Sequence, residues 1–240
     1  MHIAPFNNQN KAIIDVRDAY VPLTYFNIVK LTRGDRFEYA TPGYETCIVP
    51  ATGQIDAVVA DVTVEKLGLR GDDVWDGEPE GVYVPSGVTA EMICLSEAAE
   101  IFVAGAKFDQ TLTPFAVRAS DIDKVQYGSD ETKTHRKIKH ILGQRQADQV
   151  GRLLVSELFT VGQGGWSGFP PHKHDTDRLP DETRHDEVYN FRFKPDHGFG
   201  MQLLQPSDGS RGEAVHIVDG STFAIKAGYH PCVVAPGYEM

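Results

Sequence analysis

The chain has 240 residues and a formal net charge of −11, with 34 acidic and 23 basic side chains. This length suits one large domain or two domains of roughly 120 residues each. The acidic balance argues against a protein whose main task is to bind a nucleic-acid backbone, because that binding depends on clustered basic side chains. We therefore expect no nucleic-acid partner.

The sequence also gives no sign of a membrane protein or a disulfide-bonded protein. No apolar run approaches the ~20 residues of a membrane-spanning helix, and the first residues lack the charged-then-apolar pattern of a secretion signal. The three cysteines, Cys47, Cys94 and Cys232, are widely separated. This spacing indicates reduced core residues. The expected location is the cytoplasm, without membrane contact.

Glycine and proline, 23 and 14 residues, separate many short apolar runs. That rhythm is typical of an all-β sandwich or barrel. A helical turn is expected at 11–19, and otherwise the pattern predicts strands. In chain order they fall at 25–31, 36–40, 46–49, 55–64, 81–84, 91–95, 99–104, 115–118, 134–141, 153–161, 187–193, 199–204, 214–218 and 221–227.

The polar segment 129–133 predicts a boundary between two units, 1–128 and 129–240. A weak internal repeat supports duplication, because residues 81–87 and 222–228 both read as a strand that runs into a glycine turn. We expect two stacked, related β-barrels. Since no histidine lies between His2 and His135, only the second barrel can carry a histidine site, and the first is expected to lack metal.

Three histidines and a glutamate in the second half suggest a metal site. His172 and His174 are two residues apart, so on a strand both imidazoles would point to the same side. The prolines at 170–171 stiffen the approach to this pair. Glu187 opens a later strand-like run, and His230 follows another, between a Gly-Tyr pair and a proline. Such a set can bind a divalent metal and leave positions for water or substrate.

Asp186 is an alternative to Glu187, and strand alternation separates the two residues. On a strand Glu187 shares its face with Tyr189 and Phe191, an apolar-aromatic series suited to an interior, whereas Asp186 faces the other way. Glu187 is therefore the predicted ligand. His185 is predicted to be a solvated residue without a role in the site.

The second half resembles the 5-deoxy-glucuronate isomerase family of bacterial inositol breakdown. The pattern HxH, then glutamate, then a distant Gly-x-His is that of metal-binding cupins. More specific motifs, in chain order, are PPHKHD at 170–175, Leu179-Pro180 with Glu182, Glu187-Val-Tyr189, Gly198-Phe199, Gln202, GYHP at 228–231 and Pro236-Gly-Tyr238. The similarity is dense from Trp166 to Tyr238 and looser before it.

This resemblance implies a bicupin with His172, His174, Glu187 and His230 as ligands of Zn²⁺ or Mn²⁺. It also implies a metal-dependent aldose–ketose isomerase that converts 5-deoxy-glucuronate to 2-deoxy-5-keto-gluconate. Such a reaction needs a base for the proton beside the carbonyl and an electrophile that holds the enediolate charge. Fold analogy suggests a homodimer.

Further residues receive candidate roles from their positions near these ligands. Tyr189 and Glu182 are predicted to transfer protons, and Lys173 or Arg192 to pair with the substrate carboxylate. Two alternatives use the same metal site: an iron-dependent oxygenase and a non-catalytic sugar-binding or regulatory cupin.

Two features depart from the family pattern. Tyr189 is followed by asparagine where the family has a second aromatic residue, and His185 precedes Asp186. The family also continues through another strand beyond Met240. The resemblance thus implies a shortened second barrel with an exposed edge strand. Two alternatives follow: either the shortened relative has lost its activity, or a partner chain covers the edge.

Overall fold

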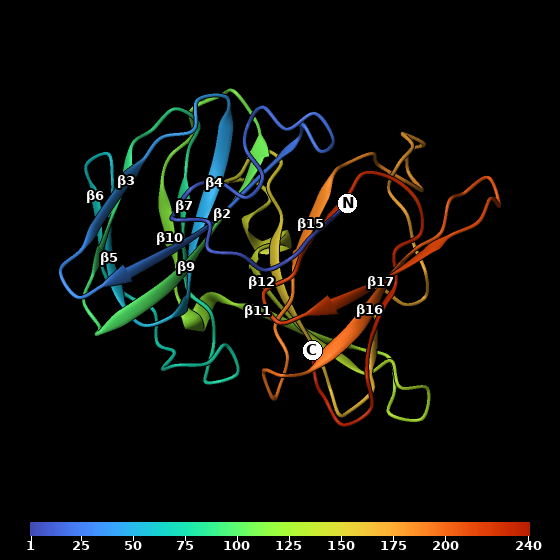
Figure 1. The fold of residues 1–240 in the computed structure, drawn as a ribbon. Coiled ribbons are helices and arrows are strands. Elements are labelled where there is room, and N and C mark those ends of the chain that lie inside the picture. Colours follow the sequence, from blue (N-terminus) through green and yellow to red (C-terminus); the bar gives the residue numbers. More distant parts are fainter.

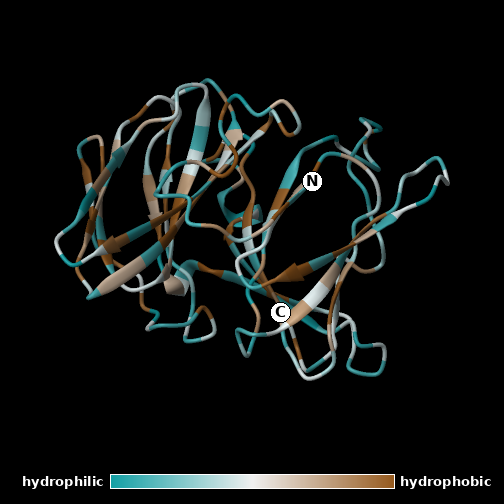
Figure 2. Cartoon of the chain, viewed as in Figure 1, coloured by the Kyte–Doolittle hydropathy of each residue, from teal (hydrophilic) through white to brown (hydrophobic).

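The computed structural model describes residues 1–240, which form nineteen strands and two short 3₁₀ helices, Ala119–Asp121 and Gln144–Gln146. Figure 1 shows two β-rich units side by side, the first drawn in blue and green and the second in yellow to red. Hydrophobic residues concentrate on the strands, and the connecting loops are mostly hydrophilic (Figure 2). No helix has the length and apolar character needed to cross a membrane.

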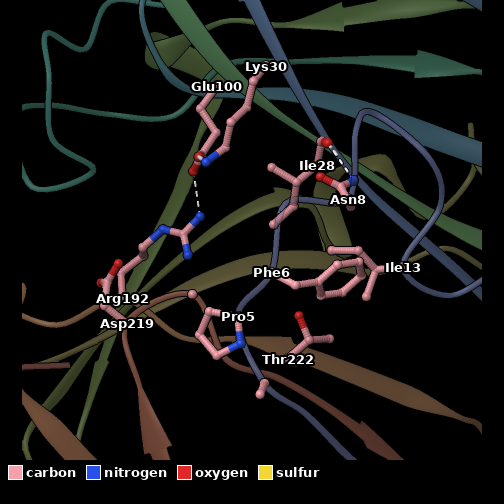
Figure 3. Close-up of a pocket in the computed structure, with 12 residues that line it drawn as sticks. Pro5, Phe6, Asn8, Ile13, Ile28, Lys30, Glu100, Arg192, Asp219 and Thr222 are labelled. Carbon is pink, nitrogen blue, oxygen red and sulfur yellow. Dashed lines mark hydrogen bonds and ion pairs between the residues drawn. The ribbon is translucent and has the colours of Figure 1, made fainter.

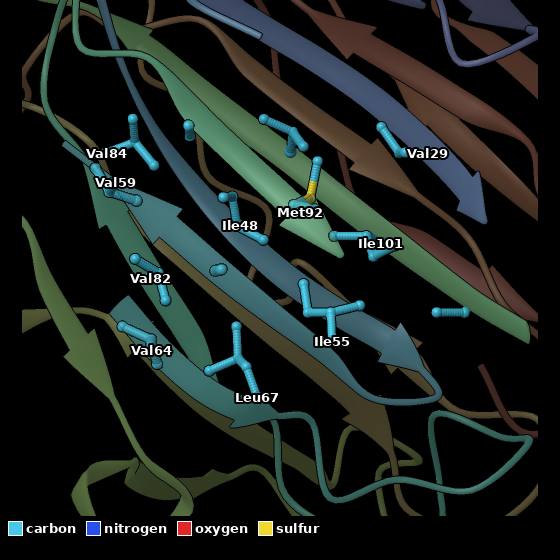
Figure 4. Packing of buried hydrophobic residues seen from close by; sticks show 14 of the residues in the cluster. Val29, Ile48, Ile55, Val59, Val64, Leu67, Val82, Val84, Met92 and Ile101 are labelled. Carbon is cyan, nitrogen blue, oxygen red and sulfur yellow. The ribbon is translucent and has the colours of Figure 1, made fainter. Parts of the chain in front are cut away.

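The first unit is a sandwich of two antiparallel sheets. In the order of pairing, the five-stranded sheet consists of β10 (Phe115–Val117), β7 (Gly81–Val84), β4 (Tyr44–Thr52), β9 (Ala98–Lys107) and β2 (Thr24–Thr32). The four-stranded sheet consists of β3 (Arg36–Tyr39), β8 (Ala90–Cys94), β5 (Ile55–Val59) and β6 (Val62–Leu67). Eighteen buried side chains from both sheets fill the space between them (Figure 4).

Alternating burial along these strands explains why the sequence pattern predicted them. In β5 and β8 every second residue is buried, as expected for strands with one face toward a core. The single strand expected at 55–64 is in fact two strands. Ala60 adopts a positive φ of 53° between them, so the chain turns back on itself and β6 pairs with β5.

The second unit contains three sheets. The first is β1 (His2–Ile3), β18 (Thr222–Ile225) and β15 (Glu187–Asn190), and the second is β14 (Trp166–Ser167), β19 (Cys232–Val234), β16 (Phe199–Leu204) and β17 (Glu213–Val218). The third is β11 (Asp123–Tyr127), β12 (Arg136–Leu142) and β13 (Val155–Thr160). A cluster that includes Phe191, Phe223 and Cys232 forms its core. The sheets are open, so each unit is a sandwich rather than a fully hydrogen-bonded barrel.

The helical turn expected at 11–19 is absent. Asp15 accepts the backbone N–H of Arg17, and Asp18 accepts those of Tyr20 and Val21. Short side chains that take up backbone donors in this way favour turns over helix. The segment instead packs against β2, where Ile14 forms an isolated bridge with Phe26.

The outer face of the five-stranded sheet is covered by the second unit. Cys47, Val49 and Tyr83 pack there against Ile141 and Leu142. Because both of its faces are covered, β4 is buried along nearly its whole length. The two units therefore share an extensive apolar interface.

A buried carboxylate lies at this interface. Glu45 accepts hydrogen bonds from the Tyr83 hydroxyl and from the backbone N–H groups of Gly151, Arg152 and Leu153. Its side chain is completely buried. Four donors to one carboxylate compensate for the loss of hydration.

Chain segments cross the boundary predicted after residue 128. Strand β11 precedes that boundary yet pairs with β12 along its full length. At the N-terminus, β1 pairs with β18 of the second unit. The last strand, β19, is paired on both sides, by β14 and β16, so the exposed edge expected at the end of the chain does not lie at this strand.

Candidate metal centre

Three of the predicted ligands converge in the second unit. One donor atom each from His174, Glu187 and His230 lies within 4.8 Å of the others. The Nε2 atoms of His174 and His230 are 2.9 Å and 3.2 Å from the same Oε2 of Glu187. His230 is completely buried and His174 almost so. This is a compact group of two imidazoles and a carboxylate, which can hold a divalent metal ion.

Strand alternation places Glu187 in the group and turns Asp186 away. Glu187 begins β15 and lies opposite Ile225 of β18. The Asp186 carboxylate lies on the other face, where Oδ2 accepts the backbone N–H of Leu23 at 3.0 Å. The structure thus places Glu187, and not its neighbour, beside the histidines.

The strand expected to carry His172 and His174 is not formed. After β14 the chain is irregular until Glu187. Pro170 and Pro171 lack the N–H groups that a strand would contribute to a ladder. The geometry of this segment depends instead on side-chain hydrogen bonds.

A network around Lys173 supplies those hydrogen bonds. The Lys173 ammonium donates to Asp175 at 2.6 Å and to both oxygens of Glu182 at 2.7 and 2.8 Å. Glu182 also accepts the backbone N–H groups of Asp175 and Thr176. The second oxygen of Asp175 accepts the backbone N–H of Gly228 at 2.8 Å. The loop that bears His174 is therefore tied to the loop that bears His230.

This network fixes the charge states of its members. The hydrogen bond from Lys173 lowers the pKa of Asp175 to about 2 and also lowers the pKa of Glu182. Both carboxylates are ionised at neutral pH. Lys173 and Glu182, predicted for substrate binding and proton transfer respectively, are thus paired with each other in this structure.

The hydrogen bonds of the two buried imidazoles fix their tautomers. Nδ1 of His174 donates to the backbone carbonyl of His185 at 2.8 Å, and Nδ1 of His230 donates to that of Gly228 at 2.9 Å. Because a carbonyl only accepts, each neutral ring keeps a lone pair on Nε2. Metal-binding histidines are commonly oriented by such contacts of the other ring nitrogen.

The arrangement fits a cation. The buried Nε2 of His230 has no hydrogen-bond partner, and two lone pairs directed at one carboxylate would repel it unless a positive charge lies among them. Burial raises the pKa of Glu187, but when protons instead of a metal ion occupy the two Nε2 positions, hydrogen bonds from His174 and His230 outweigh burial and lower this pKa to about 2. The carboxylate is therefore ionised and ready to act as a ligand.

His172, the fourth predicted ligand, lies at the rim of the group. Its ring centroid is 4.7 Å from that of His230 and 6.4 Å from that of His174, but its nitrogens are outside the close cluster. Burial, followed by the proximity of His230, lowers the pKa of His172, which favours the neutral ring. Its role as a ligand stays a prediction.

His185 is exposed in a loop, as predicted, but it also contacts the site in a way that sequence reasoning missed. Its ring stacks on that of His174 with centroids 3.7 Å apart, and its carbonyl accepts from the same imidazole. Gln202, also without a predicted role, is fully buried and donates to the backbone carbonyl of His230 at 2.8 Å. Neither contact follows from sequence spacing, because both residues approach the site from separate segments.

Tyr189 lies beside the cluster, with its ring centroid 6.1 Å from that of His230. Burial, and after it the negative charge of Glu187, raises the pKa of Tyr189 well above its ordinary value. The phenol is therefore protonated at neutral pH and can donate a hydrogen bond.

Arg192 lies at a different cavity. Its guanidinium pairs with Glu100 at 2.5 Å, and Lys30 pairs with the same carboxylate at 3.0 Å (Figure 3). The cavity has a volume of about 300 Å³ and is also lined by Pro5 and Asp219, but by none of the three clustered ligands. This geometry gives Arg192 a role in joining the two units and does not support carboxylate binding at the metal centre.

Comparisons with known proteins agree with these observations. The 5-deoxy-glucuronate isomerase of Geobacillus thermodenitrificans is 34% identical over 215 residues, which cover 89% of this chain and 76% of that relative. A crystal structure of an IolB-like protein from Salmonella typhimurium gives a TM-score of 0.90 at 24% identity, covering 99% of this chain and 89% of the other.

A mutant of Bacillus subtilis oxalate decarboxylase gives a TM-score of 0.64 at 11% identity and covers 100% of this chain and 76% of the other. Oxalate decarboxylase is a bicupin, and with the IolB-like structure this likeness confirms the predicted all-β bicupin class. The model of the KduI/IolB family matches residues 2–240. The chain therefore belongs to the KduI/IolB family.

Proposed function

We propose that this chain is a metal-dependent aldose–ketose isomerase that converts 5-deoxy-glucuronate to 2-deoxy-5-keto-gluconate. The observation that carries the proposal is the convergence of the His174 and His230 Nε2 atoms on one oxygen of Glu187. Relatives that share this chain's sequence over most of its length are named 5-deoxy-glucuronate isomerase. The site and the relatives' names point to the same chemistry.

His174, Glu187 and His230 would hold the metal ion, with His172 at the rim as the fourth ligand. Two or three imidazole nitrogens with one carboxylate oxygen suit Zn²⁺ or Mn²⁺. When bound, such an ion polarises the carbonyl of the substrate and stabilises the negative charge that develops on its oxygen. The hydrogen bonds from His174 to the His185 carbonyl and from His230 to the Gly228 carbonyl hold both rings in the ligating tautomer.

Tyr189 is the proton donor that the geometry favours. Its phenol is protonated and lies next to His230, so it can donate to a substrate oxygen on which charge develops. Glu182 is less suited to proton transfer, because it already accepts two backbone N–H groups and the Lys173 ammonium. We assign Glu182 and Lys173 to holding the loop that carries His174.

The test is a direct assay with the purified protein. Its metal content is measured first, and 5-deoxy-glucuronate is then supplied while formation of the ketone is followed by NMR. We expect turnover that is lost on chelation and restored by Zn²⁺ or Mn²⁺. Absence of turnover by protein that contains stoichiometric metal would contradict the proposal. Oxygen consumption that requires Fe²⁺ would favour an oxygenase instead.

A further inference from the structure

Arg136 is a buried cation without an anion. Only 8% of the residue is exposed, yet its guanidinium forms no ion pair or hydrogen bond with the rest of the chain, and its Nε atom is fully buried without a partner. Arg70, the other buried arginine, differs because both of its terminal nitrogens pair with the carboxylate of Glu157. The contrast shows that this fold provides a partner for one buried guanidinium and leaves the other open.

An unpaired buried charge is unfavourable in a folded protein, because the lost hydration is not compensated. Arginine remains charged in proteins, so it cannot escape that penalty by losing its proton. Buried guanidinium groups therefore pair with carboxylates or phosphates, often through two parallel hydrogen bonds. An open partner position at Arg136 indicates an anionic ligand from outside the chain.

Strand pairing places Arg136 in the interior of the second unit. It begins β12 and lies directly opposite Thr160 of β13, and residues directly opposite in an antiparallel pair project from the same face. The Thr160 hydroxyl accepts the backbone N–H of Met240 at 2.9 Å. Met240 in turn packs in the same core cluster as Cys232.

The core cluster that contains Met240 also connects Arg136 with the strands that bear the metal ligands. Cys232 belongs to this cluster, and Tyr189 packs against it. Tyr189 lies two residues after Glu187, and Cys232 lies two residues after His230. Arg136 therefore faces the same interior as the metal ligands.

We propose that Arg136 binds the carboxylate of the substrate while the reacting end of the sugar lies at the metal centre. This inference rests on the proposed isomerase function and adds the residue that selects an acidic sugar. The two basic residues first considered for this role already have carboxylate partners, Lys173 with Asp175 and Glu182, and Arg192 with Glu100. Arg136 alone among these three has its guanidinium or ammonium group unpaired.

The first experiment compares a charged and an uncharged substrate in Arg136→Met. The matched control is Lys137→Met, which removes a positive charge from the adjacent, exposed residue on the opposite face of β12. Each variant is assayed with 5-deoxy-glucuronate and with 5-deoxy-glucose, in which a hydroxymethyl group replaces the carboxylate. We expect Arg136→Met to lower kcat/KM for the uronate by roughly 10²- to 10³-fold and to change kcat/KM for the neutral sugar by less than about 3-fold.

Equal losses on both sugars, or no loss on either, would overturn the assignment of Arg136. If wild-type protein turns over neither sugar, the isomerase proposal fails, and the second experiment then tests Arg136 on its own. That experiment measures binding of gulonate, which retains a carboxylate but has no aldehyde, by calorimetry. Wild type and Lys137→Met should bind gulonate at least about 10²-fold more tightly than Arg136→Met does, and glucitol should show no such difference.

Protein stability distinguishes ligand binding from a structural role. Because the guanidinium has no partner in the chain, replacing it with methionine should leave the thermal midpoint unchanged or raise it. If Arg136→Met is instead unfolded, the role of Arg136 is structural and the proposal is wrong. Arg136→Lys retains the charge without the paired donor geometry, so its affinity for gulonate should fall between those of wild type and Arg136→Met. Wild-type affinity in this variant would contradict bidentate recognition.

Discussion

Asp175 accepts a hydrogen bond from the backbone N–H of Gly228 across 53 residues of sequence, at 2.8 Å. One end of this contact lies next to His174, and the other lies two residues before His230. The contact therefore fixes the separation of the two loops that bring their imidazoles to Glu187. It does so without touching any of the three clustered ligands.

We predict that Asp175→Ala weakens metal binding by about 10- to 100-fold, the range found when groups that orient metal ligands are removed. The loss arises because the Gly228 N–H loses its acceptor and Lys173 loses one of its two carboxylate partners. Competition with a chromogenic chelator measures the affinity. Asp181→Ala is the control, since its carboxylate is exposed and its contact with Arg178 is long, at 4.0 Å. Equal metal affinity in the two variants would show that the loops hold their positions without Asp175.

The clustered ligands and His172 should differ in their effect on metal content. We expect His174→Ala and His230→Ala to be purified without stoichiometric metal, because each removes one of the converging Nε2 atoms. His172→Ala should retain metal with lower affinity, since its ring lies at the rim. Elemental analysis of the three variants gives the answer. If His172→Ala alone lost its metal completely, the metal site would not be the cluster of His174, Glu187 and His230.

Metal removal should also lower stability. A ligand that binds only the native state stabilises it by about 2.7 kcal/mol at a concentration of 100 times its Kd. Chelation of the wild-type protein should therefore lower the thermal midpoint, and Zn²⁺ or Mn²⁺ should restore it. Glu187→Gln is the control, because it weakens the site and should show a smaller response to chelator. An unchanged wild-type midpoint would mean that the native chain holds no ion under these conditions.

Glu45 should be important for joining the two units. Glu45→Ala leaves three backbone N–H groups and the Tyr83 hydroxyl without their acceptor in a buried place. We expect a loss of about 3–5 kcal/mol in the free energy of unfolding, measured by urea denaturation. Tyr83→Phe removes only one of the four donors and should cost about 1 kcal/mol. Similar losses in both variants would show that the backbone donors find other acceptors.

Glu100 should contribute a pH-dependent term to stability. Burial raises its pKa, but Arg192 and Lys30 outweigh burial, so the pKa in the folded state lies below the ordinary value. The folded state then binds protons less readily than the unfolded state, and the contribution is present above the unfolded pKa and lost as pH falls through the folded pKa. The difference in unfolding free energy between wild type and Glu100→Gln should therefore shrink between neutral pH and pH ~3. A difference that stays constant would assign the effect to packing.

The sequence predicted most of the strands and the side to which Glu187 points, because both depend on alternation within a few residues. That periodicity placed Glu187 with Tyr189 and turned Asp186 away, as the structure has it. The irregular path around His172 and His174 could not be read in the same way, because it depends on the contacts of Asp175 and Glu182 with distant donors. The ion pair of Arg192 could not be predicted for a related reason: its partner, Glu100, belongs to the other unit.

Arg136 shows another limit of local reasoning. The alternating pattern at 134–141 indicated a half-buried strand, and in such a strand a basic residue is ordinarily solvated. Its burial follows from packing inside the second unit, and its lack of a partner becomes visible only when every nearby carboxylate is placed. His185 is similar, since its stacking on His174 depends on a loop path that no short motif encodes.

The pairing of β1 with β18 has a practical consequence for any attempt to dissect this protein. Strand β18 lies between β1 and β15, and β15 begins with Glu187. A fragment that starts at residue 129 would expose the hydrogen-bonding edge of β18, an open template for self-association. Cloning the second half alone would therefore yield aggregation-prone material with a loosened glutamate strand. A bulky amino-terminal fusion would crowd that same edge, and a carboxy-terminal fusion would disturb Met240, which is buried in the core cluster of the second unit.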